Sequence, residues 1–142
     1  SLNSLHNVIN FLRKLKKNNF IKIIYCPPST LIRPMSKKLK NSPINVGAQN
    51  CHENEHHGPF TGSVNAKMLK NVGAKFVIIG HSENRHRGEN NKLINIKIKS
   101  ALKAGLKVIF CIGETSVEKR KKIVEPSQSI SWFDVKNRIR LF

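Results

Sequence analysis

One histidine lies where the chain could carry out acid–base chemistry. Phe76–Ile79 is a short apolar run, and Gly80, His81, Ser82 and Glu83 follow it. Such a run bounded by turn residues predicts a strand buried on both faces, so His81 lies at its carboxyl end. We expect Ser82 to cap a helical turn that begins at Glu83. The positive end of a helix disfavours imidazolium, so the position suits a neutral imidazole that donates to a substrate oxygen. The alternative is a structural or surface histidine.

A second group of histidines matches a metal motif. His52-Glu53-Asn54-Glu55-His56 reads H-E-x-x-H, the zinc metalloprotease pattern, which requires both histidines on one face of a helix. Gly58-Pro59 follows within two residues, and no apolar flank anchors a helix. We therefore interpret the segment as a polar loop and expect no zinc at His52, His56 or His57.

The charge balance is strongly basic. The chain has 142 residues, enough for one modest domain, and carries 26 Lys and Arg against 8 Asp and Glu, a formal charge of +18. Such a charge attracts nucleic acid or anionic lipid without specificity. The lysines are spread along the chain together with many Asn and Ile, so drift in an AT-rich coding sequence is the competing explanation. We interpret Lys119–Lys122 as the solvated face of a helix.

The three cysteines, Cys26, Cys51 and Cys111, form no metal-type pair. An odd number without a secretory segment predicts free thiols in a reducing, cytoplasmic compartment. No apolar run approaches the roughly 20 residues of a membrane span, so we expect no membrane partner. No G-x-G-x-x-G follows a predicted strand, and we expect neither a cofactor nor a metal.

The predicted elements form one helix followed by four β-α units. The expected strands are 21–26, 44–48, 76–79 and 108–112. The expected helices are 2–15, 29–39 (made doubtful by Pro34), 63–72 (capped by Ser63), 94–102 (closed by Gly105) and 115–122. Alternation at this spacing predicts parallel βαβ units, either in an open doubly wound sheet or in part of a (β/α)8 barrel. Ligand chemistry belongs at the carboxyl edge in both, where we expect Asn50, His81, Glu83 and Glu114.

Four strand-end segments resemble those of the triosephosphate isomerase family. They are Val46–Cys51, Phe60–Gly62, Gly80–Glu83 and Cys111–Glu114, in matching order and spacing, and the resemblance covers about residues 1–120. It implies an α/β fold, a partial (β/α)8 TIM barrel with four parallel strands and flanking helices. It also implies an isomerase of glycolysis and gluconeogenesis that interconverts dihydroxyacetone phosphate and glyceraldehyde 3-phosphate by proton transfer through an enediolate.

The resemblance also assigns roles to individual residues. His81 matches the family's electrophile, which polarises the carbonyl, and Glu83 matches a supporting carboxylate beside it. Thr61 lies in the loop that reaches the neighbouring subunit of a cytoplasmic homodimer. Cys111 matches a cysteine packed under the site. Asn84 stands where the family usually has Arg, which puts the dimer contact of this chain in doubt, while Arg85 matches the Arg that follows it.

Several parts of the family's site have no match in this sequence. They are the first strand with its substrate-binding Asn and Lys, the glutamate base on a later strand, the lid loop and the phosphate-binding loops. A complete barrel takes about 250 residues, so we expect a fragment that is inactive alone. The alternative is a non-catalytic basic half-barrel that binds polyanions such as RNA. We divide the chain into a partial barrel domain, 1–120, and a divergent tail, 121–142, which a frameshift near Lys119–Lys122 would explain.

Overall fold

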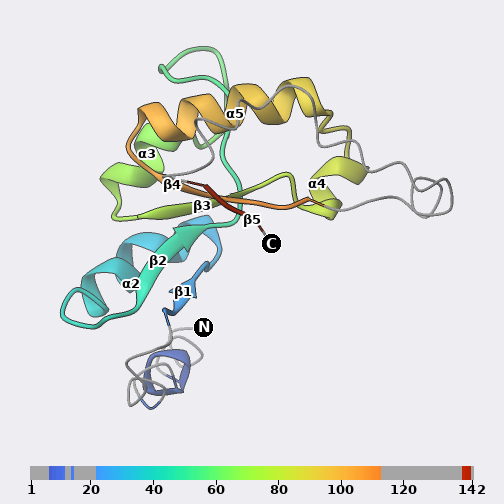
Figure 1. The fold of residues 1–142 in the computed structure, drawn as a ribbon. Helices are drawn as coiled ribbons and strands as arrows, with labels where there is room; N and C mark the ends of the chain where they lie inside the picture. Colours follow the sequence, from blue (N-terminus) through green and yellow to red (C-terminus); the bar gives the residue numbers. More distant parts are fainter. Residues whose placement is uncertain (1–6, 12–13, 15–21, 113–138, 142) are drawn as a thin grey trace, which may run out of the picture.

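The fold is built on one parallel sheet. The structure is a computed structural model that describes residues 7–11, 14, 22–112 and 139–141. Five strands lie in the sheet in the order of the sequence (Figure 1). They are β1 (Ile24–Tyr25), β2 (Asn45–Ala48), β3 (Phe76–Ile79), β4 (Lys107–Phe110) and β5 (Ile139–Leu141), and every neighbouring pair is parallel.

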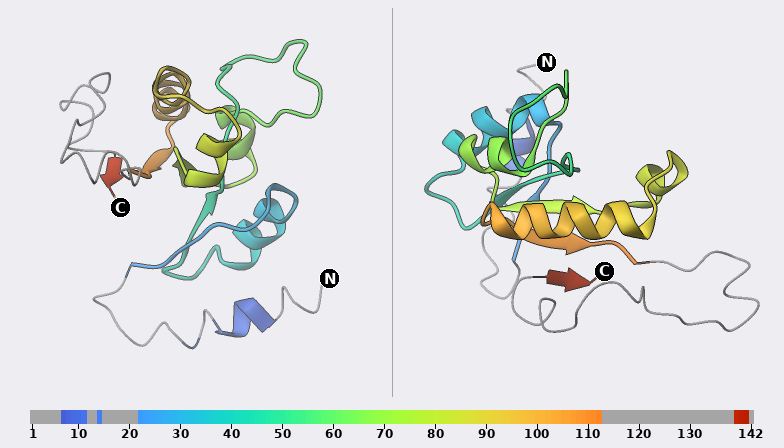
Figure 2. Two further views of the ribbon diagram at one scale, coloured as in Figure 1. Left: turned by 90° about the vertical axis from the view of Figure 1, so that its right-hand side faces the viewer. Right: turned by 90° about the horizontal axis from the view of Figure 1, so that it is seen from above.

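The strand order decides between the two architectures that the sequence left open. A doubly wound sheet reverses its strand order at a switch point, whereas the strands of a (β/α)8 barrel follow one another round the sheet. Here the order is β1-β2-β3-β4-β5 without reversal. Figure 2 shows the sheet curving, with α2 (Ile32–Lys38), α3 (Ala66–Asn71) and α5 (Asn91–Lys103) on one side of it. The fold is therefore part of a (β/α)8 barrel.

Local sequence explains where the helices begin. A 3-10 turn, η2 (Ser29–Leu31), leads directly into α2. Pro34 is tolerated because it is the third residue of α2, and the first backbone N–H groups of a helix have no partner inside it. The expected cap Ser63 is wrong: α3 begins at Ala66, where the Asn65 side chain accepts from the Met68 N–H at 2.9 Å. Gly105 follows α5 with φ +78°, as expected of a closing glycine.

The core lies between the sheet and its helices. Strand residues such as Val77, Ile79 and Val108 are fully buried, and they pack in one cluster with Ile32, Met35, Leu69 and Ile94 from the helices. Residues 7–11 and 14 are helical, within the predicted helix 2–15, and Ile9 joins the same cluster. Burial of this kind stabilises the folded state by about 25 cal/mol for each Å² of apolar surface removed from water. The core fixes the strand ends relative to one another.

The four predicted strands are confirmed, although β1 is shorter than expected, and the sheet contains a strand that the sequence did not predict. β5 lies in the segment 121–142 and pairs with β4, with Val108 opposite Ile139 and Phe110 opposite Leu141. Ile139, Arg140 and Leu141 alternate between apolar and polar, but three residues are too few for this pattern to identify a strand. Glu114, Lys119–Lys122 and the helix expected at 115–122 lie outside the described residues. Within the described part of the chain, no helix has the length and apolar character needed to cross a membrane.

Candidate active site at the carboxyl edge of the sheet

His81 lies directly beyond the end of β3, where the chain turns sharply. Gly80 has φ +78°, and a Cβ at this position would come within 3.1 Å of the Cys111 carbonyl oxygen. Only glycine fits such a turn without strain. His81 itself caps α4 (Ser82–His86) from an extended conformation, and its Nδ1 accepts from the Glu83 N–H at 3.4 Å. The expectation that Ser82 is the cap is wrong, because α4 already begins at Ser82, and the His81 carbonyl accepts from the N–H groups of Asn84 and Arg85.

The cap contact determines which nitrogen of His81 is available. An Nδ1 that accepts a hydrogen bond carries no proton, so the neutral ring holds its proton on Nε2. The His81 side chain is exposed, and Nε2 is thus a donor open to a ligand at this edge. With five residues, α4 is too short for a full helix dipole, so the Glu83 N–H is what orients the ring. The geometry suits a neutral imidazole that donates to an oxygen.

Glu83 lies beside His81 in the first turn of α4 and is exposed. Within the described residues its carboxylate makes no ion pair. Asn50, the other expected edge residue, follows β2 and is half-buried. Thr61 is exposed in the connection between β2 and α3. The edge therefore brings together Asn50, His81 and Glu83, as expected.

Arg85 ties the ends of two neighbouring strands together. Its Nε donates to the Gly80 carbonyl at 2.8 Å, and one terminal nitrogen lies 3.5 Å from the Cys111 carbonyl beyond β4. The other terminal nitrogen donates to Asn91 Oδ1 at 2.8 Å at the start of α5. A planar guanidinium suits such a fork of acceptors. Arg85 thereby fixes the turn that presents His81.

A buried ion pair lies beneath this edge. Lys97 of α5 contacts Glu89 Oε1 at 2.5 Å, and the two side chains are only 7% and 10% exposed. Asn50 donates to the same Glu89 oxygen at 2.9 Å, while Asn50 Oδ1 lies 3.4 Å from Lys97 Nζ and accepts from the Cys51 N–H at 2.8 Å. The other oxygen, Glu89 Oε2, is buried without a hydrogen-bond partner. The cluster joins the end of β2 to the segment that follows α4.

Sequence reasoning missed Glu89 and Lys97. A signal for Lys97 was present, because it stands between Ile94, Ile98 and Ala101 on the apolar face of α5. A lysine at such a position requires a buried partner. Nothing in the sequence identified Glu89 as that partner, since the two residues meet only after α4 and α5 are placed.

The thiols near this edge are protonated at neutral pH. Burial raises the pKa of Cys51 to about 12 and that of Cys26 to about 11. Burial also raises the pKa of Cys111, which is half-buried at the end of β4. Because the thiolate is the nucleophilic form, these residues pack at the site rather than attack a substrate.

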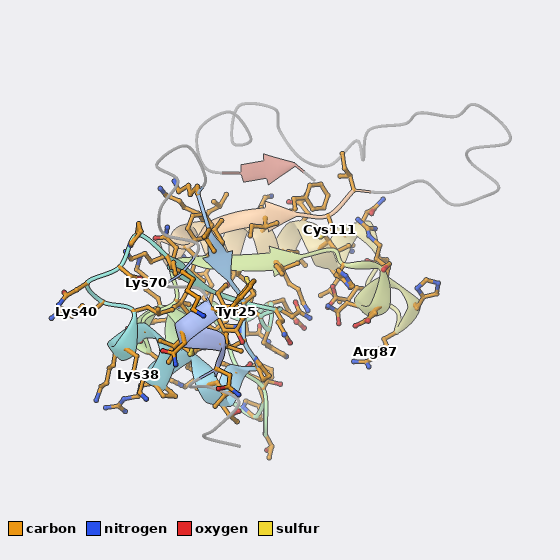
Figure 3. All side chains as sticks on the ribbon, turned by 90° about the horizontal axis from the view of Figure 1, so that it is seen from below. Tyr25, Lys38, Lys40, Lys70, Arg87 and Cys111 are labelled. Carbon is orange, nitrogen blue, oxygen red and sulfur yellow. The ribbon has the colours of Figure 1, made fainter. Side chains whose placement is uncertain are left out.

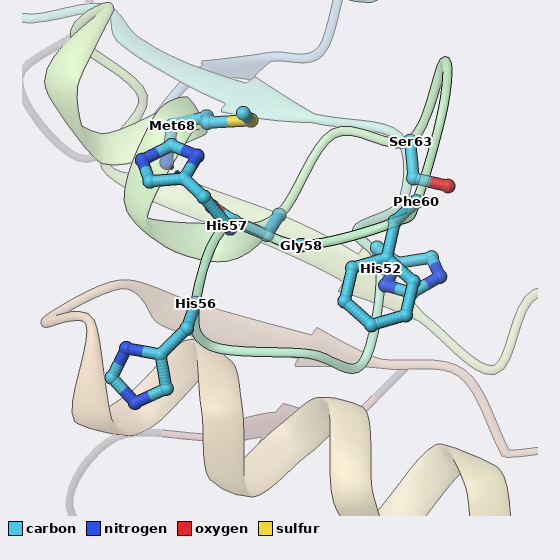
Figure 4. A pocket seen from close by; sticks show the side chains of 8 residues that line it. His52, His56, His57, Gly58, Phe60, Ser63 and Met68 are labelled. Atoms are coloured by element: carbon cyan, nitrogen blue, oxygen red, sulfur yellow. Dashed lines mark hydrogen bonds between the residues drawn. The ribbon is translucent and has the colours of Figure 1, made fainter.

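The H-E-x-x-H segment is a loop, as expected. His52 packs against Phe60 with ring centroids 5.0 Å apart, and His56 lies away from both (Figure 4). The loop surrounds a pocket of about 70 Å³, lined by His52, His56, His57, Phe60, Ser63 and Met68 among others. In the described ranges, no three His, Cys, Asp or Glu side chains come together in a way that could hold a metal. The absence of zinc stays a prediction.

Comparisons with known proteins agree on one family. The family model of triosephosphate isomerase matches residues 2–131. A triosephosphate isomerase from Carboxydothermus hydrogenoformans is 43% identical over 119 residues, which cover 83% of this chain and 47% of the relative. One from a Wolbachia of Brugia malayi is 43% identical over 124 residues, covering 82% and 51%. The chain spans about half the length of the curated relatives it matches.

A solved structure gives the same result for the fold. The crystal structure of triosephosphate isomerase from Bartonella henselae superposes with a TM-score of 0.66 at 40% sequence identity. The superposition covers 70% of this chain and 42% of that one.

Proposed function

This chain belongs to the triosephosphate isomerase family, and we propose that its carboxyl edge serves the interconversion of dihydroxyacetone phosphate and glyceraldehyde 3-phosphate. His81 is the electrophile of the proposed site. The observation that carries this role is the Nδ1 contact with the Glu83 N–H at 3.4 Å, which leaves the Nε2 proton of an exposed ring for the substrate. A donor in this place polarises a carbonyl and stabilises the enediolate that proton removal produces.

Glu83 and the buried cluster have supporting roles in this proposal. Glu83 contributes the N–H that orients His81. Asn50, Glu89 and Lys97 hold the segment after α4 against the end of β2. They keep the turn at His81 in one geometry without contacting the reacting carbon, so they are positioning residues.

Family membership also supports a proposal for the partner and the compartment. The exposed loop that holds Thr61 contacts the second subunit of a homodimer in this proposal, and Asn84 weakens that contact relative to relatives with Arg. The three thiols, Cys26, Cys51 and Cys111, are free, which suits the reducing cytoplasm. Triose phosphate is the ligand, and the proposed activity involves neither a membrane nor specific nucleic acid.

The 142-residue chain by itself has no isomerase activity in this proposal. Removal of a proton next to a carbonyl requires a base within hydrogen-bond reach of that carbon, and the sequence matches the family's electrophile without matching its base. In addition, β1 has no partner on its far side within the described sheet, and open edges and uncovered apolar faces favour aggregation. We expect poor solubility of the chain alone.

A coupled assay with glyceraldehyde 3-phosphate tests both parts of the proposal. The purified chain is expected to give no rate above buffer. A mixture with a polypeptide that carries the second half of a relative's sequence is expected to give a measurable rate. Activity of the chain alone would disprove the inactivity, and a folded but inactive mixture would count against the function.

A further inference from the structure

We propose that the opposite edge of the sheet, where the strands begin, binds the phosphate backbone of double-stranded nucleic acid. The proposal goes beyond the isomerase function and uses none of its residues. It concerns a set that we name the amino-edge lysines. They are Lys22, Lys40, Lys70, Lys75 and Lys107.

Topology brings the amino-edge lysines to one end of the molecule. Lys22 precedes β1, Lys75 directly precedes β3 and Lys107 opens β4. Lys40 lies in the turn from α2 to β2, and Lys70 in the last turn of α3 before β3. In Figure 3, Lys40 and Lys70 lie at the end of the molecule away from Cys111 and Arg87. All five side chains are exposed.

Contacts confirm that members of the set come close together. The ammonium groups of Lys22 and Lys107 lie 6.0 and 5.8 Å from the centre of the same ring, that of Phe76. The backbone N–H of Lys107 donates to the Lys75 carbonyl at 2.9 Å, so these two residues are neighbours across strands. Lys70 Nζ donates to the Gly105 carbonyl at 2.9 Å. Gly105 lies two residues before the start of β4, so Lys70 is also close to this strand end.

No acidic residue of the described part of the chain forms an ion pair with an amino-edge lysine. The acidic side chains there are Glu53 and Glu55 in the loop after β2, Glu83 in α4 and Glu89 after it. Their ion pairs are with His52, Lys97 and Lys103, not with an amino-edge lysine. Clustered lysines without acidic partners produce a positive electrostatic potential, and this potential attracts a polyanion. Glu83 and Glu89 lie at the opposite edge, whereas Glu55 pairs with Lys103 in the last turn of α5.

The surroundings of the amino-edge lysines favour nucleic acid over a lipid surface. Stable membrane anchoring takes apolar side chains that insert beside the charges, in addition to electrostatic attraction. The large exposed apolar residues of the described ranges are Phe11, Phe60, Val64, Ile96 and Ile112, and none adjoins a strand start. Phe76 is aromatic but 3% exposed, so it offers no ring for base stacking. Lysines alone contact phosphates, which predicts sequence-independent binding to a duplex backbone.

Fluorescence anisotropy tests the proposal with a labelled RNA duplex of about 20 base pairs and a DNA duplex of the same sequence, at about 0.05–0.2 M salt. The edge variant replaces Lys22, Lys70, Lys75 and Lys107 by Gln. The control variant replaces Lys14, Lys67, Lys92 and Lys99, which are equally exposed, by Gln. A double variant, Lys40→Gln with Lys75→Gln, keeps the test usable if the edge variant does not fold.

The edge variant is expected to bind at least about tenfold more weakly than the unmodified chain. Its plot of log K against log salt should also be less steep by about 3–4, because each lost phosphate contact removes about 0.9 from the magnitude of the slope. The control variant is expected to change affinity by less than about threefold. Equal losses in the two variants, or no binding by the unmodified chain, would overturn the proposal. Preferential binding to vesicles that contain phosphatidylserine would do so too. The two duplexes show whether RNA or DNA is preferred.

Discussion

The two edges of the sheet are built in opposite ways. At the carboxyl edge, Arg85 and Lys97 have partners from other elements: Arg85 contacts Gly80 and Asn91, and Lys97 contacts Glu89. At the amino edge, the lysines are exposed and lack acidic partners in the described residues. The side chains of the carboxyl edge are held by contacts within the protein, whereas the lysines of the amino edge are available to bind a charged ligand.

The difference shows how one fold separates geometry from electrostatics. A catalytic edge must hold a histidine within a narrow range of positions, which requires partners that are desolvated and mutually hydrogen-bonded. An edge that attracts a polyanion needs charge density only, and flexible solvated lysines suffice. Substitutions should therefore have large effects at the first edge and small effects on stability at the second.

The largest effect is expected at His81. In a fusion of this chain to the second half of a relative, His81→Gln should lower turnover by about 10²–10⁴, because a positioned acid–base group contributes that much. His86→Gln is the matched control, since His86 lies exposed at the end of the same helix. Steady-state kinetics in both directions measure the change. Unchanged turnover in the His81 variant would remove it from the mechanism.

The next effect is expected at Lys97. Lys97→Met leaves the Glu89 carboxylate buried without its cation, and we expect the free energy of unfolding to fall by about 3–5 kcal/mol. Urea denaturation measures it. Lys99→Met, at an exposed site on the same helix, should change stability by less than about 0.5 kcal/mol.

A double variant sharpens the interpretation of the Lys97 result. Lys97→Met combined with Glu89→Leu removes both charges and should recover part of the loss. A loss that is equal in the single and double variants would mean that packing, not charge, explains the effect of Lys97→Met.

An effect of similar size, confined to alkaline pH, is expected in the stability contributed by Cys51. Burial raises its pKa from 9.0 to about 12, so the thiol stays protonated in the folded chain while it ionises in the unfolded one. Its contribution is complete below about pH 9 and is lost as pH rises toward 12, at about 1.4 kcal/mol per pH unit. Cys51→Ala should have a shallower decline over this range. Parallel declines would show that Cys51 does not titrate in this way.

The smallest effect is expected for single amino-edge lysines. Lys40→Gln and Lys75→Gln should each change the free energy of unfolding by less than about 0.5 kcal/mol, because these exposed side chains make no ion pair in the described ranges. Thermal unfolding followed by circular dichroism measures the change. A loss as large as that of Lys97→Met would break the comparison between the edges.

Much of the fold was predictable from sequence because it depends on local patterns. Apolar runs such as Phe76–Ile79 form parallel strands, and Gly105 ends α5 because it can adopt a positive φ. The positions of His81 and Asn50 at the carboxyl edge followed from the alternation of strands and helices alone. The loop conformation of His52–His56 followed from Gly58 and Pro59. These features depend on residues close together in the sequence.

Tertiary structure decided what depends on distant residues meeting. The strand order excluded the doubly wound alternative, because pairing between strands is not encoded in either strand alone. β5 forms only because β4 offers it an open edge. Lys97 becomes a structural residue through Glu89 and Asn50, which come from other segments. His81 replaces Ser82 as the cap because Gly80 turns the imidazole back onto the Glu83 N–H. The sequence determined which residues reach the edge, and packing determined how they are held there.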